Sequence, residues 1–506
     1  MRAAPMLTRV APADRAVPRS RGDRYALAVE AALLAAAVVV GLVLNRRGVG
    51  LHADAAPLYA TWRPHAGWGT LPAVLIAAAV FGPGLPWART ARWGPLLAAG
   101  WLAAVAWTLS LALVDGWSAG LTRRLTVQAE YLHEVPGVVD IPRMLAGFTG
   151  RILDFQPDSW STHTAGHPPG ALLVFVWLDR IGLGGGTAAA LCCVLVGATA
   201  AVSVPVTLRA LGAADAARAV LPFLVLLPGA VWLGASGDAI FTGVVAAGLA
   251  LLAVRGPVAA LAGGLLLGFA LHLSYGFVLV GALAVAVLAL RRDRRRAAAL
   301  AATAGVVAVT ALFVLAGFRW WEGYDRVVER YYQGWAADRP YGYWVWANLA
   351  ALLLSAGPVL GPALRRAALA ARAVWRSPDV ASKRDRQPRD DRPRPGPATR
   401  PTMSRAVARL SLPGREPAAL TAPGRWLVAR AARLGPTVLL PAAAASVVLA
   451  ADLSGMSKAE VERIWLPFVV WLLVAVAHLP APARRWWLVG QALTALAVNH
   501  LLLTVS

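Results

Sequence analysis

Hydrophobic segments of membrane-spanning length alternate with short polar segments along most of the chain. The first apolar segment, residues 25–44, is about 20 residues long, which is the length of a transmembrane helix. The pattern predicts an all-α fold, a polytopic membrane helical bundle of about 13 spans. The predicted spans are residues 25–44, 70–86, 94–114, 187–208, 219–234, 239–254, 257–272, 275–290, 297–317, 344–364, 436–451, 464–480 and 486–504.

A long polar interval separates the third predicted span from the fourth. Residues 118–134 and 141–153 carry apolar side chains at helical spacing, yet both segments are too polar to cross a membrane. Helices of this kind lie in the membrane interface. Residues 115–186 are therefore predicted to form a large outer loop that contains interfacial helices.

Residues 168–182 determine the orientation of every later span. The segment is apolar for only about a dozen residues before Asp179, which is short for a span. If it crossed the membrane, the Arg-rich turns at 209–218 and 291–296 would lie outside. If it stays in the interface, both turns lie inside, as the positive-inside rule requires. We therefore predict a third interfacial helix here, a cytoplasmic N-terminus and an outer C-terminus.

Two polar segments lack hydrophobic periodicity and are rich in Arg and Pro. Such segments cannot bury enough apolar surface to fold, so we predict that both are disordered and cytoplasmic. The predicted division of the chain is a tail (1–24), the first three spans (25–114), the outer loop (115–186), a membrane bundle (187–364), a basic linker (365–434) and the last three spans (436–506).

Composition and charge agree with this interpretation. The chain has 506 residues, of which 58% are hydrophobic and 15% charged, and its net charge is +23. Soluble domains carry about 25% charged residues. A basic chain can bind nucleic acid, but here the Arg residues gather at span ends and in the linker. The prediction is a multi-pass protein of the cell membrane that contacts membrane lipids and no nucleic acid.

Several polar side chains fall on the outer side in this topology. Charged groups at membrane depth are costly and usually mark a site or a pathway. Each also has an ordinary structural explanation: Asp238 follows Ser-Gly as in a helix start, and Glu462-Arg463 could be a surface pair. The candidates, which the predicted topology brings to one side, are Asp115, His163, His167, Asp238, His272, Glu322 and Arg463.

The sequence His167-Pro168-Pro169-Gly170 is a more specific signal. Proline is favoured in the first turn of a helix, where its missing N–H costs nothing. The pair of prolines therefore fixes the start of the third interfacial helix and places His167 at the positive end of its dipole. That position suits a phosphate group, although a structural cap with an incidental histidine explains the motif too.

Three motifs carry a family resemblance. They are VDGW at 114–117, HTAGHPPGALL at 163–173 and LLPGAVWLGASGDAIF at 226–241. Over residues 94–290 the chain resembles the GT-C superfamily, membrane glycosyltransferases that use polyprenyl-phosphate sugars. The first motif departs from the family, where two adjacent acids are common, because Gly116 follows Asp115. An alternative first-loop site is His52-Ala53-Asp54.

The resemblance implies an integral-membrane enzyme that transfers a hexosyl or pentosyl group on the outer face. The donor would be a polyprenyl-phosphate sugar, and the acceptor a hydroxyl of a lipid, a glycan or a protein. Asp115 would act as general base or help to hold a divalent metal, Mg²⁺ or Mn²⁺, and the other six candidates would bind substrate. A transporter or flippase of lipid-linked sugars, which should show inverted repeats, and a non-catalytic envelope-assembly protein are the alternatives.

Overall fold

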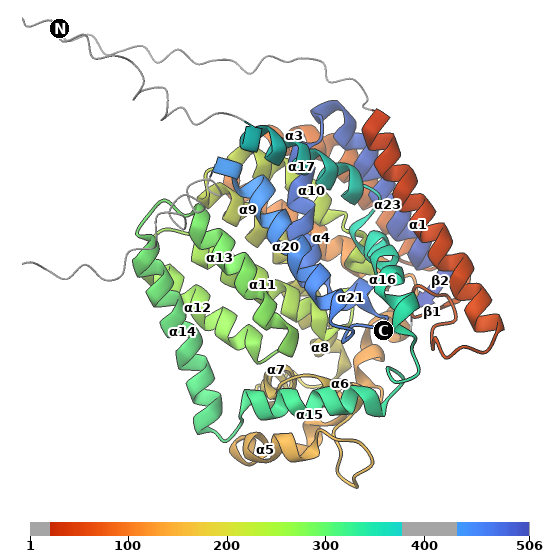
Figure 1. The fold of residues 1–506 in the computed structure, drawn as a ribbon, viewed down its shortest axis with the longest axis vertical. Coiled ribbons are helices and arrows are strands. Elements are labelled where there is room, and N and C mark those ends of the chain that lie inside the picture. Colours follow the sequence, from red (N-terminus) through yellow and green to blue (C-terminus); the bar gives the residue numbers. More distant parts are fainter. Residues whose placement is uncertain (1–20, 377–432, 505–506) are drawn as a thin grey trace, which may run out of the picture.

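The computed structural model describes residues 21–376 and 433–504 as a helical bundle with a short two-stranded ribbon (Figure 1). Within these residues, 6 helices are long and apolar enough to cross a membrane, so the membrane helical bundle is confirmed in outline while a count of 13 is not. These helices are α1 (Arg21–Arg46), α2–α3 (Thr70–Thr90), α4 (Trp93–Ala112), α8–α9 (Gly186–Ala210), α14 (Arg295–Leu315) and α20 (Pro436–Leu453).

A bent pair of helices would add a seventh candidate span. It consists of α16 (Tyr341–Ala356) and α17 (Leu360–Arg376), which meet at 97°. Residues 365–376, which the sequence placed in the linker, therefore belong to a helix. Asp23 at the start of α1 accepts hydrogen bonds from Arg365 and Arg366 of α17, at 3.1 and 3.0 Å. The predicted tail before residue 21 and the linker from 377 to 432 lie outside the described residues.

The other predicted spans correspond to helices outside this set. Gly264 of α12 lies so close to α14 that an added Cβ would come within 2.1 Å of the Ala302 carbonyl oxygen. Small residues of this kind let two helices approach closely in a membrane. These helices are α10 (Ala214–Val225), α11 (Gly237–Ala253), α12 (Pro257–Leu271), η8–α13 (Tyr275–Leu290), α22–η9 (Leu466–His478) and α23 (Arg484–Leu501), and all but α23 are shorter than 18 residues.

Short amphipathic elements gather at one end of the bundle, at the bottom of Figure 1. They are α5 (Ile141–Gly147), α6 (Thr162–Gly166), α7 (Pro169–Arg180) and α15 (Trp320–Gln333). The helix predicted at 168–182 is confirmed as α7, and the one at 141–153 is present as α5 followed by a 3-10 turn. The opposite end carries α3 and α17. Sequence periodicity therefore found two of these elements and missed α15, the helix that carries Glu322.

The continuous helix predicted at 118–134 is wrong. The segment forms a π turn at Ser118–Thr122 and 3-10 turns at Arg124–Thr126 and Tyr131–His133. Three of its side chains, Leu121, Leu125 and Tyr131, are buried, whereas Val127 is exposed. Apolar residues spaced for one face of a helix can therefore also occur in a folded loop. Here each of the three short turns buries one of these side chains.

The two strands join distant parts of the chain. β1 (Ala60–Trp62) pairs antiparallel with β2 (Leu502–Thr504), and Ala60 lies opposite Thr504. The pairing continues beyond β1, because the His65 amide donates to the His500 carbonyl at 2.8 Å. In the predicted span at 486–504, the helix therefore ends at Leu501, and the last residues form a strand paired with β1.

Candidate functional site

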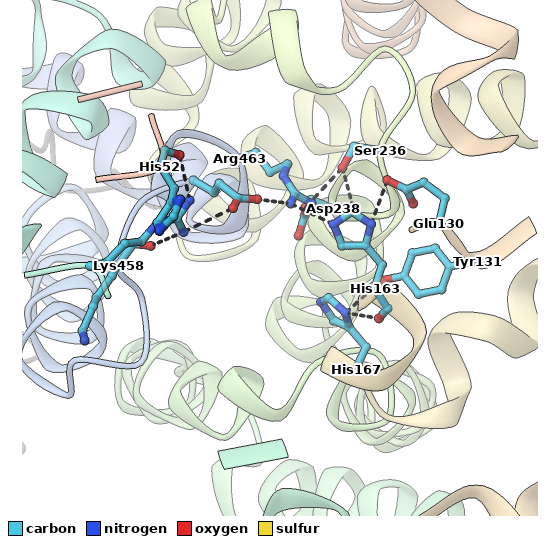
Figure 2. Close-up of polar contacts among 11 residues, drawn as sticks. His52, Glu130, Tyr131, His163, His167, Ser236, Asp238, Lys458 and Arg463 are labelled. Atoms are coloured by element: carbon cyan, nitrogen blue, oxygen red, sulfur yellow. Dashed lines mark hydrogen bonds and ion pairs between the residues drawn. The ribbon is translucent and has the colours of Figure 1, made fainter. Parts of the chain in front are cut away.

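A buried guanidinium, that of Arg463, is the centre of a charged cluster in the polar part of the bundle (Figure 2). Its Nη1 lies 2.9 Å from Asp238 Oδ2, and its Nη2 lies 2.6 Å from Glu460 Oε2. Nη2 also lies 3.2 Å from His163 Nε2. Burial lowers the pKa of Arg463, but its carboxylate neighbours outweigh burial and raise it, so the side chain is a permanent cation. Asp238 and His163, which are far apart in the sequence, thus meet on one side chain.

His163 links this guanidinium to a further acid. Its Nδ1 lies 2.9 Å from Glu130 Oε1. Because a guanidinium only donates, Nε2 of His163 accepts from Arg463, and the ring proton sits on Nδ1, toward Glu130. Burial disfavours the charged ring, but Glu130 outweighs it and raises the pKa of His163. Burial likewise raises the pKa of Glu130, and His163 reverses the effect and lowers it.

His167 has one nitrogen fixed and the other available. Its Nδ1 lies 2.8 Å from the His163 carbonyl oxygen and 3.0 Å from the Tyr131 hydroxyl. A carbonyl only accepts, so Nδ1 carries the proton and Nε2 holds a lone pair. Within the described residues Nε2 has no hydrogen-bond partner and is not buried away from solvent. Burial lowers the pKa of His167, which keeps the ring neutral at neutral pH.

Local sequence explains how these groups are presented. Pro168 and Pro169 start α7, as predicted, and Gly170 lets that start sit against α12, where a Cβ would come 2.4 Å from the His272 carbonyl oxygen. Ser236 is the N-cap of α11, and its hydroxyl oxygen accepts from the Asp238 amide at 3.2 Å. The cap role suggested for Asp238 therefore belongs to Ser236, and the Asp238 carboxylate is left to pair with Arg463.

A second arginine, Arg339, joins this cluster to the segment between α1 and β1. Its Nη1 lies 3.5 Å from Glu460 Oε1, and its other donors reach the carbonyl oxygens of Leu51 and His52 at 3.2 Å. Burial raises the pKa of Glu460, but Arg463 and Arg339 outweigh it and lower it. Glu460 adopts a left-handed backbone, with φ 61°, which is uncommon for a side chain of this kind. The strained turn holds Glu460 between its two arginines.

The neighbouring Glu462 is different. It is fully buried, and within the described residues neither of its carboxyl oxygens has a hydrogen-bond partner. Burial raises the pKa of Glu462 to about 7. Desolvation disfavours the charged form of a carboxyl, so Glu462 keeps its proton to a higher pH than an exposed glutamate does. The sequence allowed Glu462-Arg463 to be a surface pair, but both residues are buried. Arg463 pairs with Asp238 and Glu460, whereas Glu462 does not pair with Arg463.

Asp115 belongs to a separate cluster. Its Oδ1 lies 2.7 Å from His65 Nε2, and its Oδ2 lies 3.1 Å from Arg124 Nη2. Nδ1 of His65 lies 2.7 Å from the Arg63 carbonyl oxygen, so both ring nitrogens of His65 face acceptors. Arg124 also donates to Thr504 Oγ1, at 3.0 Å, from the ribbon. Both carboxylate oxygens of Asp115 are therefore engaged by basic side chains.

Two glycines make the Asp115 cluster compact. A Cβ at Gly67 would come 2.1 Å from the Val114 carbonyl oxygen, and one at Gly120 would come 1.8 Å from that of Ala112. Real Cβ atoms do not approach so closely, so only glycine fits at either position. The end of α4 is consequently packed closely between the segment before α2 and the π turn that follows α4. This packing places His65 beside Asp115.

The remaining candidates lie outside both clusters. His272 stacks on Phe313, with ring centroids 3.9 Å apart, and donates from Nδ1 to the Gly268 carbonyl. Glu322 is an exposed residue of α15 paired with Arg319 at 2.8 Å. His52, the alternative first-loop site, lies 3.2 Å from Asp338. The structure thus brings together His163, His167, Asp238 and Arg463.

Five charged or imidazole side chains in or beside the two clusters were not among the seven candidates: His65, Arg124, Glu130, Glu460 and Arg339. Each is a polar residue of an outer segment in the predicted topology, and that was the available signal. Nothing in the local sequence of Glu130 separates it from the other polar residues of 118–134. Its importance depends on contact with His163, from another part of the chain.

A metal site is not supported by these residues. Among residues 21–376 and 433–504, no three His, Cys, Asp or Glu side chains are arranged to hold a metal ion. The acids of the Arg463 cluster are instead neutralised by arginine and histidine. We derive no step that uses Mg²⁺ or Mn²⁺.

Comparison with known proteins gives no family: no protein-family model, no curated protein and no solved structure matches the chain. The functional interpretation therefore depends on the residues of the two clusters. We refer to them as the Arg463 cluster (Glu130, Tyr131, His163, His167, Asp238, Glu460 and Arg463) and the Asp115 cluster (His65, Asp115, Arg124 and Thr504).

Proposed function

We propose that the protein is an integral-membrane glycosyltransferase that moves a sugar from a polyprenyl-phosphate donor to an acceptor hydroxyl. The observation that carries the proposal is the Arg463 cluster. Within it, HTAGHPPG contributes His163 and His167, GASGDAIF contributes Asp238, and Arg463 links the two segments. Two of the three motifs behind the family resemblance are thus supported by a shared contact.

The surroundings suit a substrate that is part lipid and part sugar. Helices long and apolar enough for a membrane make up the bundle, while amphipathic α5, α7 and α15 lie at one end (Figure 1). A polyprenyl tail needs apolar helix surface, and a sugar phosphate needs polar groups beside it. The outer face of the cell membrane remains the proposed location, because it follows from the arginine distribution along the sequence.

For the proton acceptor, the contacts favour His167. A general base needs a lone pair within reach of the acceptor hydroxyl and a pKa near or below the working pH. Nε2 of His167 has its lone pair free, because the proton on Nδ1 is directed at the His163 carbonyl. Sugar transfer would then proceed as the acceptor oxygen bonds to the anomeric carbon, its proton passes to Nε2 and the polyprenyl phosphate leaves.

Asp115, to which the resemblance assigns the base, is the competing candidate. Each carboxylate oxygen of Asp115 is already engaged by a basic side chain, His65 on one and Arg124 on the other. In our proposal it therefore orients the loop between α4 and the Arg463 cluster. His65 and Arg124 would hold it in that role.

The deciding experiment measures sugar transfer from a panel of polyprenyl-phosphate sugars in membranes that contain the full chain. We expect His167→Gln to reduce turnover by about 10²-fold or more, the usual contribution of a general base, without loss of folded protein. Asp115→Asn should retain more activity, because asparagine keeps one oxygen for Arg124. His133→Gln, an exposed histidine outside both clusters, is the matched control.

The results of this experiment distinguish His167 from Asp115 as the general base. Wild-type activity should fall as pH decreases through the lowered pKa of His167, since the base must be neutral. Full turnover in His167→Gln together with loss in Asp115→Asn would move the base to Asp115. Absence of transfer from every donor in the wild type would reject the glycosyltransferase and favour a transporter or an assembly protein.

A further inference from the structure

Two turns lie at the end of α14 that is farther from α15 (Figure 1), and an arginine side chain joins them. Arg291, which follows α13, is almost fully buried and donates to the carbonyl oxygens of Leu252 and Gly256 at 2.6 and 3.2 Å. These acceptors lie at the turn between α11 and α12. Arg295 folds back and donates to the Ala289 carbonyl at 2.6 Å. Arg291 thereby joins the two turns, and Arg295 closes the turn between α13 and α14.

Four other arginines of these turns are presented to the outside. They are exposed, and within the described residues no carboxylate or carbonyl accepts from their side chains. The acid in the same turns, Asp293, lies 3.9 Å from Arg291. An open pocket adjoins the α13–α14 turn and is lined almost entirely by arginine. We call the exposed set the arginine corner, and it consists of Arg255, Arg292, Arg294 and Arg296.

The backbone adds to the positive field at this place. Arg294 has a left-handed conformation, with φ 35°, and no side chain caps the start of α14. The first intrahelical hydrogen bond is donated by Ala298, to the Arg294 carbonyl. Earlier amides of the first turn therefore remain available as donors, at the positive end of the helix dipole. Guanidinium groups and free amides together favour a phosphate.

Apolar side chains flank the corner on three helices. Val258 of α12 is 78% exposed, Leu300 of α14 is 73% exposed and Val285 of α13 is 65% exposed. Each lies within about two helical turns of the arginines. Exposed apolar surface beside a phosphate site is what a phospholipid requires, since its acyl chains continue from its headgroup. A free phosphate ion would gain nothing from this surface.

We infer that the arginine corner binds the headgroup of an anionic phospholipid whose acyl chains lie along α12, α13 and α14. The site is independent of sugar transfer and lies at the other end of α14 from the amphipathic elements. Anionic lipids are attracted by clustered Lys and Arg at a membrane surface. Here the fixed geometry of the two turns would add selectivity for a phosphate to that general attraction.

The test uses the full chain purified in a neutral detergent, with phosphatidylglycerol or phosphatidylcholine added in mixed micelles. We expect phosphatidylglycerol to raise the melting temperature and phosphatidylcholine to leave it unchanged. The double variant Arg292→Gln/Arg296→Gln should bind phosphatidylglycerol about tenfold to thirtyfold more weakly. The control Arg319→Gln/Arg326→Gln removes the same charge from exposed ion pairs of α15 and should bind as the wild type does.

Three results would overturn the inference. Equal weakening in the two double variants would mean general electrostatic attraction rather than a site. An equal response to both lipids would mean that the headgroup charge is not recognised. Inorganic phosphate that reproduces the shift at equal concentration would make the site one for a free anion. Since these residues are exposed, the variants should fold, and the two-lipid comparison on the wild type needs no variant.

Discussion

The Arg463 cluster and the Asp115 cluster differ in how their charged side chains are paired. In the first, a single cation is shared by Asp238, Glu460 and, through His163, Glu130. In the second, a single anion is shared by two basic groups. The first leaves a neutral histidine lone pair free at its edge, and the second leaves no carboxylate oxygen free. The difference shows that a charged residue at a suitable sequence position is not by itself a reactive one.

The two clusters also differ in how they are supported. Glycine contacts and the β1–β2 ribbon clasp Asp115, whereas Arg463 stands in a short helix after a strained turn. Substitution of the shared charged residue should therefore destabilise the protein more at Arg463 than at Asp115. The neighbours of Arg463 would be left as buried acids with fewer partners, which is expensive in a region of low dielectric constant.

The largest expected effect is that of Arg463→Met. The substitution leaves the buried Asp238 without its cation and leaves Glu460 with Arg339 alone, so we expect a loss of about 3–5 kcal/mol in the free energy of unfolding. Thermal melting in detergent measures it, and Arg326→Met on exposed α15 is the control, with less than about 0.5 kcal/mol expected. A change in Arg463→Met as small as in the control would show that the cluster is solvated.

A smaller effect, dependent on pH, is expected for His163→Gln. The raised pKa of His163 means that its stabilising contribution is complete below its ordinary value of 6.5 and is lost as pH rises through the folded value. Glu130, whose pKa is lowered, contributes above its ordinary 4.5. The destabilisation should therefore be larger at pH 6, about 1–3 kcal/mol, than at pH 8.5.

Melting curves of wild type and His163→Gln at the two pH values give this difference, and His133→Gln should show none. A loss that is equal at both values would mean that the ring keeps one protonation state. A loss that grows with pH would mean that Arg463, rather than Glu130, dominates the environment of His163.

The smallest expected effect concerns the Asp115 cluster. Thr504→Val removes an acceptor of Arg124 while it keeps the shape of the strand, and a loss of about 1 kcal/mol is expected. Thr504→Ser keeps the hydroxyl and should melt as the wild type does. Equal melting of the valine and serine variants would show that the ribbon, and not this hydrogen bond, secures the cluster.

Much of the architecture could be read from the chain. The apolar segments that became α1, α4, α14 and α20 are long, continuous and bounded by polar residues, so length and hydropathy suffice to find them. The start of α7 at the proline pair was equally local. Asp238 and Arg463 could be selected as candidates because a charge between apolar segments is rare. The shorter helices could not be distinguished from membrane spans, because hydropathy along the sequence does not show where a helix ends within the folded bundle.

The sequence by itself determined the helical bundle, the places of its polar interruptions and the identity of Asp115, His167 and Asp238 as groups worth following. Only the tertiary structure decided which of them meet. Asp115 is held by His65, fifty residues earlier, and Asp238 is paired with Arg463 from another helix. Helical and strand patterns reflect contacts a few residues apart, whereas the partner of a charge depends on how distant segments pack. For that reason the polar loop after α4 proved to be one segment that serves two clusters, with Asp115 at its start and Glu130 farther along.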